Sequence, residues 1–302
     1  MRPIGAGWLP HIRSFGPIMG KELNETAQVA RGLGPDPFQG SLASARRPED
    51  PLEPVRYAPS EPLNLRQNDV HVWSFCLDVP VASLTRFHGI LSPDELERAQ
   101  RFHFEKHRKR YIAGRGWLRT LLGGYLGIPP EGITFAYGEY GKPELLGKCG
   151  NQEIHFNLTH SDSIACAAVT RAGAVGLDIE HVRPLTDMGE LVNRFFSPRE
   201  SSLFEMLNRN EQPGAFFNLW TRKEAWLKAT GEGISQYLKQ VEVSFLPGET
   251  PQLLELPERF QRACEWSLHA LNPGPGLKGA LAIAVRGTSI AHWHWSEFRA
   301  AS

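Results

Sequence analysis

The sequence has 302 residues, and Lys plus Arg equals Asp plus Glu at 33 each, so its formal net charge at pH 7 is zero. This balance lacks the basic excess of proteins built mainly to bind nucleic acid, and it excludes nucleic acid as an expected partner. The four cysteines show neither zinc spacing nor a disulfide framework, and no apolar run is long enough to cross a bilayer. We therefore expect a cytoplasmic protein without a membrane partner.

Residues 1–66 show no sustained helical or strand period, and prolines recur from Pro35 onward. This segment is expected to be an extended or disordered N-terminal arm. Ordered structure is predicted to begin with an alternating strand over residues 69–75. A helix start follows, with Ser92 as the N-cap, Pro93 in the first turn and Glu95 closing a capping box.

The helical pattern runs through Phe102 and resumes over about 106–126, with an apolar stripe that indicates a buried face: Ile112, Leu118, Leu121, Leu122 and Tyr125. This region also carries a strongly basic set of residues: Arg98, Arg101, Lys106 to Arg110, Arg115 and Arg119. The set is either a solvated face, or a phosphate clamp combined with a surface for an acidic partner. Strands are predicted at 133–137 and 154–158, with a turn at 140–143 between them.

A similar order of elements returns in the second half. After strands at 164–169 and 174–179, Ser197-Pro198-Arg199-Glu200 repeats the helix start at Ser92. A long helix is predicted over 214–230, and further strands at 241–245, 264–271 and 280–285. This repetition predicts an α/β (α+β) fold of two pseudo-symmetric lobes, residues 67–170 and 171–302, with a site in the cleft between them.

Two pairs of charged residues are the main candidates for chemistry. Asp178 and Glu180 lie on one face of a strand, and their mutual repulsion favours a divalent cation over simple solvation. Glu224 and Lys228 lie four residues apart on one helix face, where spacing alone favours an ordinary surface ion pair. Aromatic neighbours such as Trp220 and Trp226 indicate a buried helix, which makes charges on it more notable.

Two polar segments could bind phosphate. Thr159-His160-Ser161 follows an apolar strand, and Lys142 stands between Gly141 and Pro143 in a tight turn. Donors of this kind suit phosphate, although a lone histidine is usually structural and Lys142 could equally be a surface lysine. The sequence has no G-x-S-x-G elbow, no Walker loop and no dinucleotide glycine fingerprint, which disfavours a serine hydrolase and the common nucleotide folds.

Read together, these segments resemble the 4′-phosphopantetheinyl transferase superfamily, in its two-lobed Sfp-type branch. The matching segments stand in the order and spacing of that family: 140–143, 156–161, 175–180, 195–198 and 220–228 with Gly231 and Gly233. The departures are mild. Thr159 stands where the family usually has serine, and Leu177 where isoleucine or valine is usual.

The resemblance implies two α/β lobes with coenzyme A bound between them. It implies transfer of the 4′-phosphopantetheine group to a serine of an acyl or peptidyl carrier protein of fatty-acid, polyketide or nonribosomal-peptide biosynthesis, with release of adenosine 3′,5′-bisphosphate. By matching positions, Asp178, Glu180 and Glu224 would hold Mg²⁺, with Mn²⁺ as an alternative. The 3′-phosphate would contact Arg98, Thr159 and His160, and Lys142 would lie along the adenosine side.

In the same assignment Glu224 would be the base toward the carrier serine, directly or through a metal-bound water, and Lys228 would neutralise or protonate the departing bisphosphate. A single chain that builds both lobes is expected to act as a monomer. Two rival interpretations use the same residues differently. One is a metal-dependent hydrolase of a nucleotide or pyrophosphate, and the other is a non-catalytic module that binds coenzyme A or carrier proteins.

Overall fold

The computed structural model describes residues 56–57, 64–146, 154–232, 237–261 and 266–295. Most of the expected N-terminal arm lies outside these described residues, as do Cys149, Gly233 and Cys264. Within the described part, Cys76 and Cys166 are free thiols, and none of the helices there is long and apolar enough to cross a membrane.

One half of the molecule is built on a five-stranded sheet with the order β1-β12-β2-β6-β5. The neighbours of β6 run antiparallel to it, whereas β12 runs parallel to both β1 and β2. The strands are β1 (Arg56–Tyr57), β2 (Asp69–Cys76), β5 (His155–Ser161), β6 (Ile164–Thr170) and β12 (Ser289–Trp295). Its outer face packs on α2 (Val81–Ile90), α3 (Pro93–Gln100) and α4 (Glu105–Leu126), next to η1 (Pro130–Gly132) and the β3 (Phe135–Tyr137)–β4 (Pro143–Leu145) hairpin.

The other half is built on an antiparallel three-stranded sheet of order β10-β11-β7. Its strands are β7 (Val175–His181), β10 (Ser267–Leu271) and β11 (Leu277–Ile283). Three helices cover its outer side: α5 (Met188–Phe195), α6 (Pro198–Glu205) and α7 (Gln212–Thr230). The β8 (Glu242–Val243)–β9 (Leu253–Glu255) ladder and α9 (Glu258–Gln261) complete this half.

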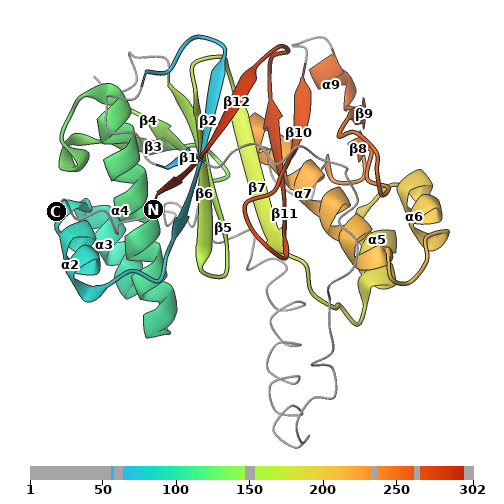
Figure 1. Cartoon of the computed structure of the whole chain (residues 1–302), viewed down its shortest axis with the longest axis horizontal. Coiled ribbons are helices and arrows are strands. Elements are labelled where there is room, and N and C mark those ends of the chain that lie inside the picture. The colour runs from blue at the N-terminus through green and yellow to red at the C-terminus, as the bar shows by residue number, and fades with distance from the viewer. Residues whose placement is uncertain (1–55, 58–63, 147–153, 233–236, 262–265, 296–302) are drawn as a thin grey trace, which may run out of the picture.

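The two sheets pack together through their inner faces, and the helices lie on the outside of each (Figure 1). A core cluster joins side chains of both sheets at this junction: Val70, Val72, Cys166 and Ala168 from one, and Val175, Leu177, Ile179, Leu271, Leu281 and Ile283 from the other. The expected α/β (α+β) fold with two similar halves is therefore confirmed. The apolar stripe predicted on α4 is also confirmed, since all five of its residues are buried.

Both predicted capping boxes are present, at Ser92 and at Ser197. In each half the capping glutamate is buried and pairs with the long helix that follows. Glu95 accepts from Arg115 and Arg119 of α4, and Glu200 accepts from Lys223 of α7. The interpretation of the basic set as a solvated face is therefore wrong for Arg115 and Arg119, because both are buried and donate to the buried Glu95.

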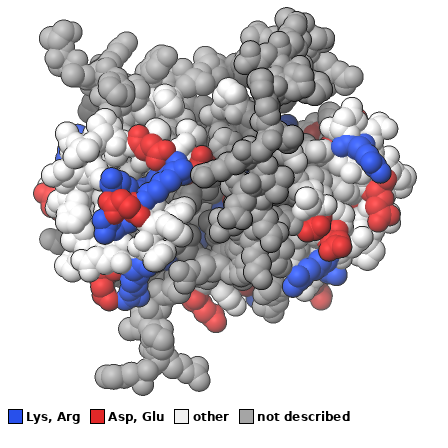
Figure 2. All heavy atoms as spheres, turned by 90° about the horizontal axis from the view of Figure 1, so that it is seen from below, with Lys and Arg blue, Asp and Glu red and all other residues white. Residues whose placement is uncertain are grey.

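Most of the other residues in this basic set pair with neighbouring acids. Lys109 and Arg108 pair with Glu105 in the same helix, and Arg110 bridges Asp78 and Asp162. In the view from below, the visible described surface shows basic and acidic side chains interspersed and no large patch of one sign (Figure 2). This distribution agrees with the zero net charge of the sequence.

The last described strand was not anticipated from the sequence. β12 lies near the C-terminus, yet it pairs with β2 along the whole register from Ser289↔Asp69 to Trp295↔Phe75. The chain thus returns from the second half to complete the sheet of the first half. The division into lobes at residues 170 and 171 stays a prediction, and β12 belongs by pairing to the first sheet.

Candidate active site

The candidate site lies where β7, α7 and β5 meet, and a glycine permits the contact. A Cβ atom added at Gly176 of β7 would stand 2.0 Å from the Ala225 carbonyl oxygen and 2.2 Å from the Ala229 nitrogen. Only glycine allows a helix backbone to approach a strand so closely. The even-numbered face of β7, which carries Asp178 and Glu180, therefore lies directly against α7, which carries Glu224 and Lys228.

The side chains of β5 complete this junction. Asn157 accepts from the Leu177 backbone N–H (2.9 Å), Thr159 donates to Asp178 Oδ1 (3.3 Å), and Ser161 donates to Glu180 Oε2 (3.0 Å). Alternation along a strand puts these three residues on one face of β5, with Phe156 and Leu158 in the helix-covered core. Polar side chains of β5 thus face the acidic strand β7 across the junction of the two sheets.

Lys228 is brought to Asp178 rather than to solvent. Its Nζ donates to Asp178 Oδ1 at 2.5 Å and to Thr159 Oγ1 at 3.1 Å. The interpretation of Glu224 and Lys228 as an ordinary surface ion pair is therefore wrong, because Lys228 pairs with β7 and Glu224 is only 4% exposed. Glu180 is held separately, by Ser161 and by Arg183 Nη1 at 3.5 Å.

Burial and mutual repulsion perturb all three acids. Burial raises the pKa of Asp178, although Lys228 opposes the shift. Burial, followed by the charge of Asp178, raises the pKa of Glu180 to about 7 and that of Glu224 to about 8. Burial works against the charge of Lys228, but Asp178 and Glu224 outweigh it and raise the lysine pKa. The cluster is thus short of positive charge, which is a condition that favours a bound cation.

The donor set fits a hard divalent cation in its chemistry. Asp178 Oδ2 and Glu224 Oε1 are buried and have no hydrogen-bond partner among the described residues. An unpartnered buried carboxylate oxygen is costly, and such oxygens are the ligands that Mg²⁺ prefers. No group of three or more His, Cys, Asp or Glu side chains in the described part is already arranged to hold a metal. Asp178 and Glu224 are therefore the ready donors, whereas Glu180 is held through Oε2 by Ser161 and Arg183.

Thr159 and His160 do not point the same way, since neighbours on a strand alternate between its faces. Thr159 faces Asp178 and Lys228, whereas His160 lies on the other face, with Nδ1 buried and without a partner among the described residues. Burial, and then the nearby charge of Lys228, lower the pKa of His160 to about 4. The imidazole is therefore neutral at physiological pH.

Lys142 lies at the seam between the halves instead of standing out from a surface turn. Its turn is closed by Gly141, whose φ of 79° is in the left-handed region. The lysine Nζ donates to the Val175 carbonyl oxygen at 3.3 Å and to the Ala229 carbonyl oxygen at 2.9 Å, at the near ends of β7 and α7. Burial lowers its pKa to about 8.

Arg98 is not joined by a hydrogen bond to the other predicted phosphate ligands, Thr159 and His160, within the described residues. It is in the last turn of α3, half-buried, with its guanidinium 5.9 Å from the ring centroid of Tyr111 on α4. The interactions described above link Thr159, Asp178, Glu180, Glu224 and Lys228, and none of them includes Arg98.

Comparisons with known proteins identify the family. Residues 174–285 match the model described as the 4′-phosphopantetheinyl transferase superfamily, and residues 81–171 match that of the 4′-phosphopantetheinyl transferase N-terminal region. The chain is 41% identical over 233 residues to 4′-phosphopantetheinyl transferase HetI of Nostoc sp. strain PCC 7120. The alignment covers 77% of this chain and 95% of HetI. The chain belongs to the 4′-phosphopantetheinyl transferase superfamily.

Other relatives agree with this assignment. This transferase is 30% identical over 190 residues to 4′-phosphopantetheinyl transferase Sfp of Bacillus subtilis strain 168, covering 63% of this chain and 81% of Sfp. A crystal structure of holo-[acyl-carrier-protein] synthase from Neisseria meningitidis matches 37% of the chain and 96% of its own length, with a TM-score of 0.31 and 18% identity. The sequence matches to HetI and Sfp confirm the resemblance to the Sfp-type branch and the expected enzyme class.

In this phosphopantetheinyl transferase, three residues of the site were missed as site residues by sequence reasoning. Ser161 and Arg183 hold Glu180, and Gly176 admits α7. Ser161 could have been found, because it shares a strand face with Thr159. Gly176 could also have been found, because a glycine two residues before a functional acid on a buried strand signals close backbone approach.

Proposed function

We propose that this transferase moves the 4′-phosphopantetheine group of coenzyme A to a serine of an acyl or peptidyl carrier protein and releases adenosine 3′,5′-bisphosphate. One observation carries the proposal: Asp178 and Glu224, from different elements, each keep a buried carboxylate oxygen unpartnered among the described residues, next to Lys228. Phosphoryl transfer depends on positioning and on neutralising charge at the phosphate oxygens, and this cluster has groups for both tasks.

Asp178, Glu224 and Glu180, whose Oε2 accepts from Ser161, are the residues that would hold Mg²⁺ or Mn²⁺. The bound ion would neutralise the pyrophosphate oxygens and polarise the phosphorus that is attacked. Glu224 is proposed to take the proton of the carrier serine. Burial and the charge of Asp178 raise its pKa to about 8 in the metal-free site, and a bound cation would lower that pKa and favour the unprotonated form that a base requires.

Lys228 is proposed to neutralise the departing bisphosphate. Its Nζ lies between Asp178 and Thr159, so a short movement of a flexible four-carbon stem would bring it to a phosphate beside them. Thr159 would contribute its hydroxyl to the same phosphate end. His160, being neutral, could meet a phosphate only as a hydrogen-bond donor and not as a cation.

The remaining roles keep their sequence-based assignments as parts of the proposal. Arg98 would contact the 3′-phosphate, and Lys142 would lie along the adenosine side. Lys142 Nζ donates to two backbone carbonyl oxygens, and the third N–H of its ammonium group would be available to the nucleotide. We further propose that the enzyme acts as a cytoplasmic monomer, with carrier proteins as its macromolecular partners.

The test is the intact mass of an apo carrier protein after incubation with the enzyme, coenzyme A and Mg²⁺. Wild-type enzyme should add the phosphopantetheine mass to the carrier. Asp178→Ala and Glu224→Gln should abolish the addition, whereas the exposed Glu205→Gln on α6 should behave as wild type. Full activity of either site variant would refute the site assignment.

The rival functions give different products in the same assay. A hydrolase would release adenosine bisphosphate from coenzyme A at the same rate with and without carrier protein. A non-catalytic module would bind coenzyme A and leave both substrates unchanged. The proposal requires that release of the bisphosphate depend on apo carrier protein and stop when the carrier has been converted.

A further inference from the structure

We infer that the buried ion pair between Lys223 and Glu200 is a positioning device, which sets the rotation of α7 and thereby aims Glu224 at Asp178. The inference rests on the proposed role of Glu224 as a reacting group. Lys223 directly precedes Glu224 in the helix, so any constraint on the direction of one side chain also constrains the other.

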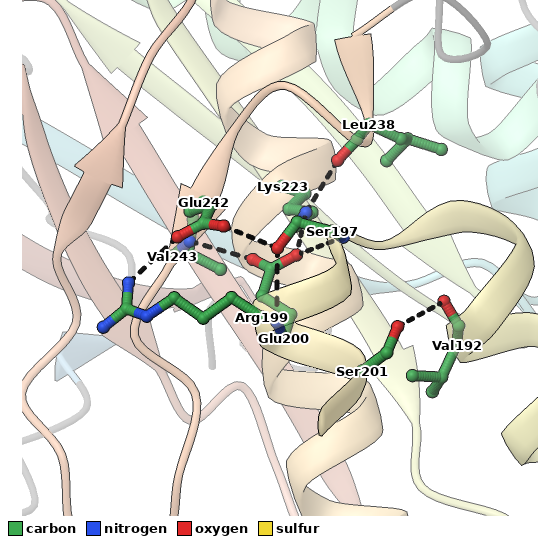
Figure 3. Close-up of polar contacts among 9 residues, drawn as sticks. All are labelled: Val192, Ser197, Arg199, Glu200, Ser201, Lys223, Leu238, Glu242 and Val243. Atoms are coloured by element: carbon green, nitrogen blue, oxygen red, sulfur yellow. Dashed lines mark hydrogen bonds and ion pairs between the residues drawn. The ribbon is translucent and has the colours of Figure 1, made fainter. Parts of the chain in front are cut away.

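Lys223 is held firmly on its own side of the helix. Its side chain is fully buried, and Nζ donates to Glu200 Oε2 at 2.5 Å and to the Leu238 carbonyl oxygen at 2.6 Å (Figure 3). The ammonium also lies 5.1 Å from the ring centroid of Phe196. A charged group with two short, differently directed acceptors leaves the helix little freedom to turn about its axis.

Glu200 is itself fixed by backbone N–H groups of its own helix cap and of β8. Its Oε2 accepts from the Ser197 N–H at 3.0 Å, and its Oε1 accepts from the Val243 N–H at 3.1 Å. Ser197 in turn donates to Glu242 Oε1 at 2.6 Å, as Figure 3 shows. The glutamate therefore ties the start of α6 and strand β8 to the middle of α7, and Lys223 is bound to a rigid frame.

The opposite flank of α7 is held by β7. The backbone of Ala225 and Ala229 rests on Gly176 so closely that the helix cannot move toward the strand. The contact with Gly176 does not by itself prevent rotation of α7 about its axis, because glycine has no side chain to interlock with the helix. A rotation of about 10° would move a carboxylate at the end of a side chain by roughly 1 Å. Displacements of this size can reduce a rate about 100-fold.

A contribution to folding stability does not explain well why this ion pair is buried here. Replacing a buried ion pair by two apolar side chains of similar volume is often neutral or stabilising, because desolvation offsets the attraction. Glu200→Met combined with Lys223→Met should therefore fold. The double variant loses the directional anchor of α7 but retains apolar volume at both positions, so it separates a positioning role from a stabilising role.

The experiment compares wild type with this double variant by thermal unfolding and by transfer kinetics to an apo carrier protein. We expect a melting temperature within about 4 °C of wild type. The KM for coenzyme A should stay within about twofold, and kcat should fall by roughly 10- to 100-fold. Arg199→Ala is the matched control: it removes an exposed member of the same network, which pairs with Glu242, and should leave kcat unchanged.

A second variant covers the case in which the double variant does not fold. Glu200→Gln keeps the shape, removes the charge and turns one of the two oxygens that accept backbone N–H bonds into a donor, and it should lower kcat with little change in KM. A folded double variant with wild-type kcat overturns the inference, as does a loss of cooperative unfolding in both variants, which would make the pair an element of stability alone.

Glu224→Gln in the same assay separates this inference from the proposed function. If that variant keeps wild-type kcat, the proposed role of Glu224 fails and the positioning inference fails with it. If Glu224→Gln is inactive and the folded double variant is fully active, the site assignment stands and only the positioning inference is lost.

Discussion

Gly176→Ala tests the close contact between β7 and α7 on which the whole site depends. The added Cβ would lie 2.0 Å from the Ala225 carbonyl oxygen, whereas ordinary contact begins at 3.4 Å, so the helix must move by about 1.4 Å. Both atoms that it meets first, in Ala225 and Ala229, belong to the backbone, so no side chain can rotate away. Overpacking of this kind costs about 1–3 kcal/mol or more.

The same displacement would disrupt the charge cluster. A shift of about 1.4 Å applied to the 2.5 Å contact between Lys228 and Asp178 would take it beyond hydrogen-bond distance. An unpartnered buried carboxylate adds roughly 1–3 kcal/mol. The total loss for Gly176→Ala is then about 3 kcal/mol or more, which corresponds to a fall in melting temperature of roughly 6–12 °C.

The assay is thermal unfolding together with intact-mass transfer to an apo carrier protein. Gly214→Ala in the first turn of α7 is the matched control, because no atom lies within 4 Å of its added Cβ. It should be neutral or stabilise the protein by up to about 1 kcal/mol, since alanine is the better helix former. If Gly176→Ala melts and reacts as wild type does, the close contact is not what positions α7.

Three further predictions concern the charges of the site. Because the pKa values of Glu180 and Glu224 are raised to about 7 and about 8, native protonation contributes stability at low pH that is lost as pH rises toward 8. Mg²⁺ competes with those protons, so the rise in melting temperature on its addition should be larger at pH 8.5 than at pH 6, and an equal rise at both would contradict a carboxylate site. The pKa of His160 is lowered to about 4, below the usual 6.5, so the unfolded chain takes up the proton first and stability is lost as pH falls from about 6.5 to 4. In denaturant unfolding, the stability of wild type relative to His160→Gln should fall by about 2 kcal/mol between about pH 7 and pH 5, and equal pH dependence of the two would speak against a buried neutral imidazole. Lys228→Met removes the internal counter-charge of Asp178. Binding of Mn²⁺ without coenzyme A, measured by calorimetry, should therefore become tighter, although transfer is lost. Weaker binding would show that the lysine does not compete with the cation.

Local features of this chain were predicted well because their causes are local. The alternation over residues 175–180 puts Leu177 and Ile179 in the core and leaves Asp178 and Glu180 on the other face, and the structure shows this arrangement. The two Ser-Pro-x-Glu helix starts form the expected capping boxes, since the hydrogen bonds involved join residues three apart. The family motif likewise depends on short segments and their order.

Longer-range features did not follow from spacing. β12 was missed because a parallel partner at the far end of the chain leaves no mark in the local pattern. Arg115 and Arg119 were grouped with a basic set read as a solvated face or a phosphate clamp, because nothing near them in sequence reveals that Glu95 of α3 is buried against them. Spacing also suggested that Glu224 and Lys228 pair with each other. In the structure α7 packs against β7, and Lys228 forms its ion pair with Asp178 instead.

The sequence by itself thus determined many of the elements, the two similar halves, the family and the set of candidate residues, because each of these depends on neighbours along the chain. Only the tertiary structure decided which charges meet. It did so through Gly176, which lets α7 lie on β7 and brings Asp178, Glu224 and Lys228 into one buried cluster. The perturbed pKa values and the unpartnered carboxylate oxygens arise there because burial removes water from charges that sequence spacing alone would leave exposed.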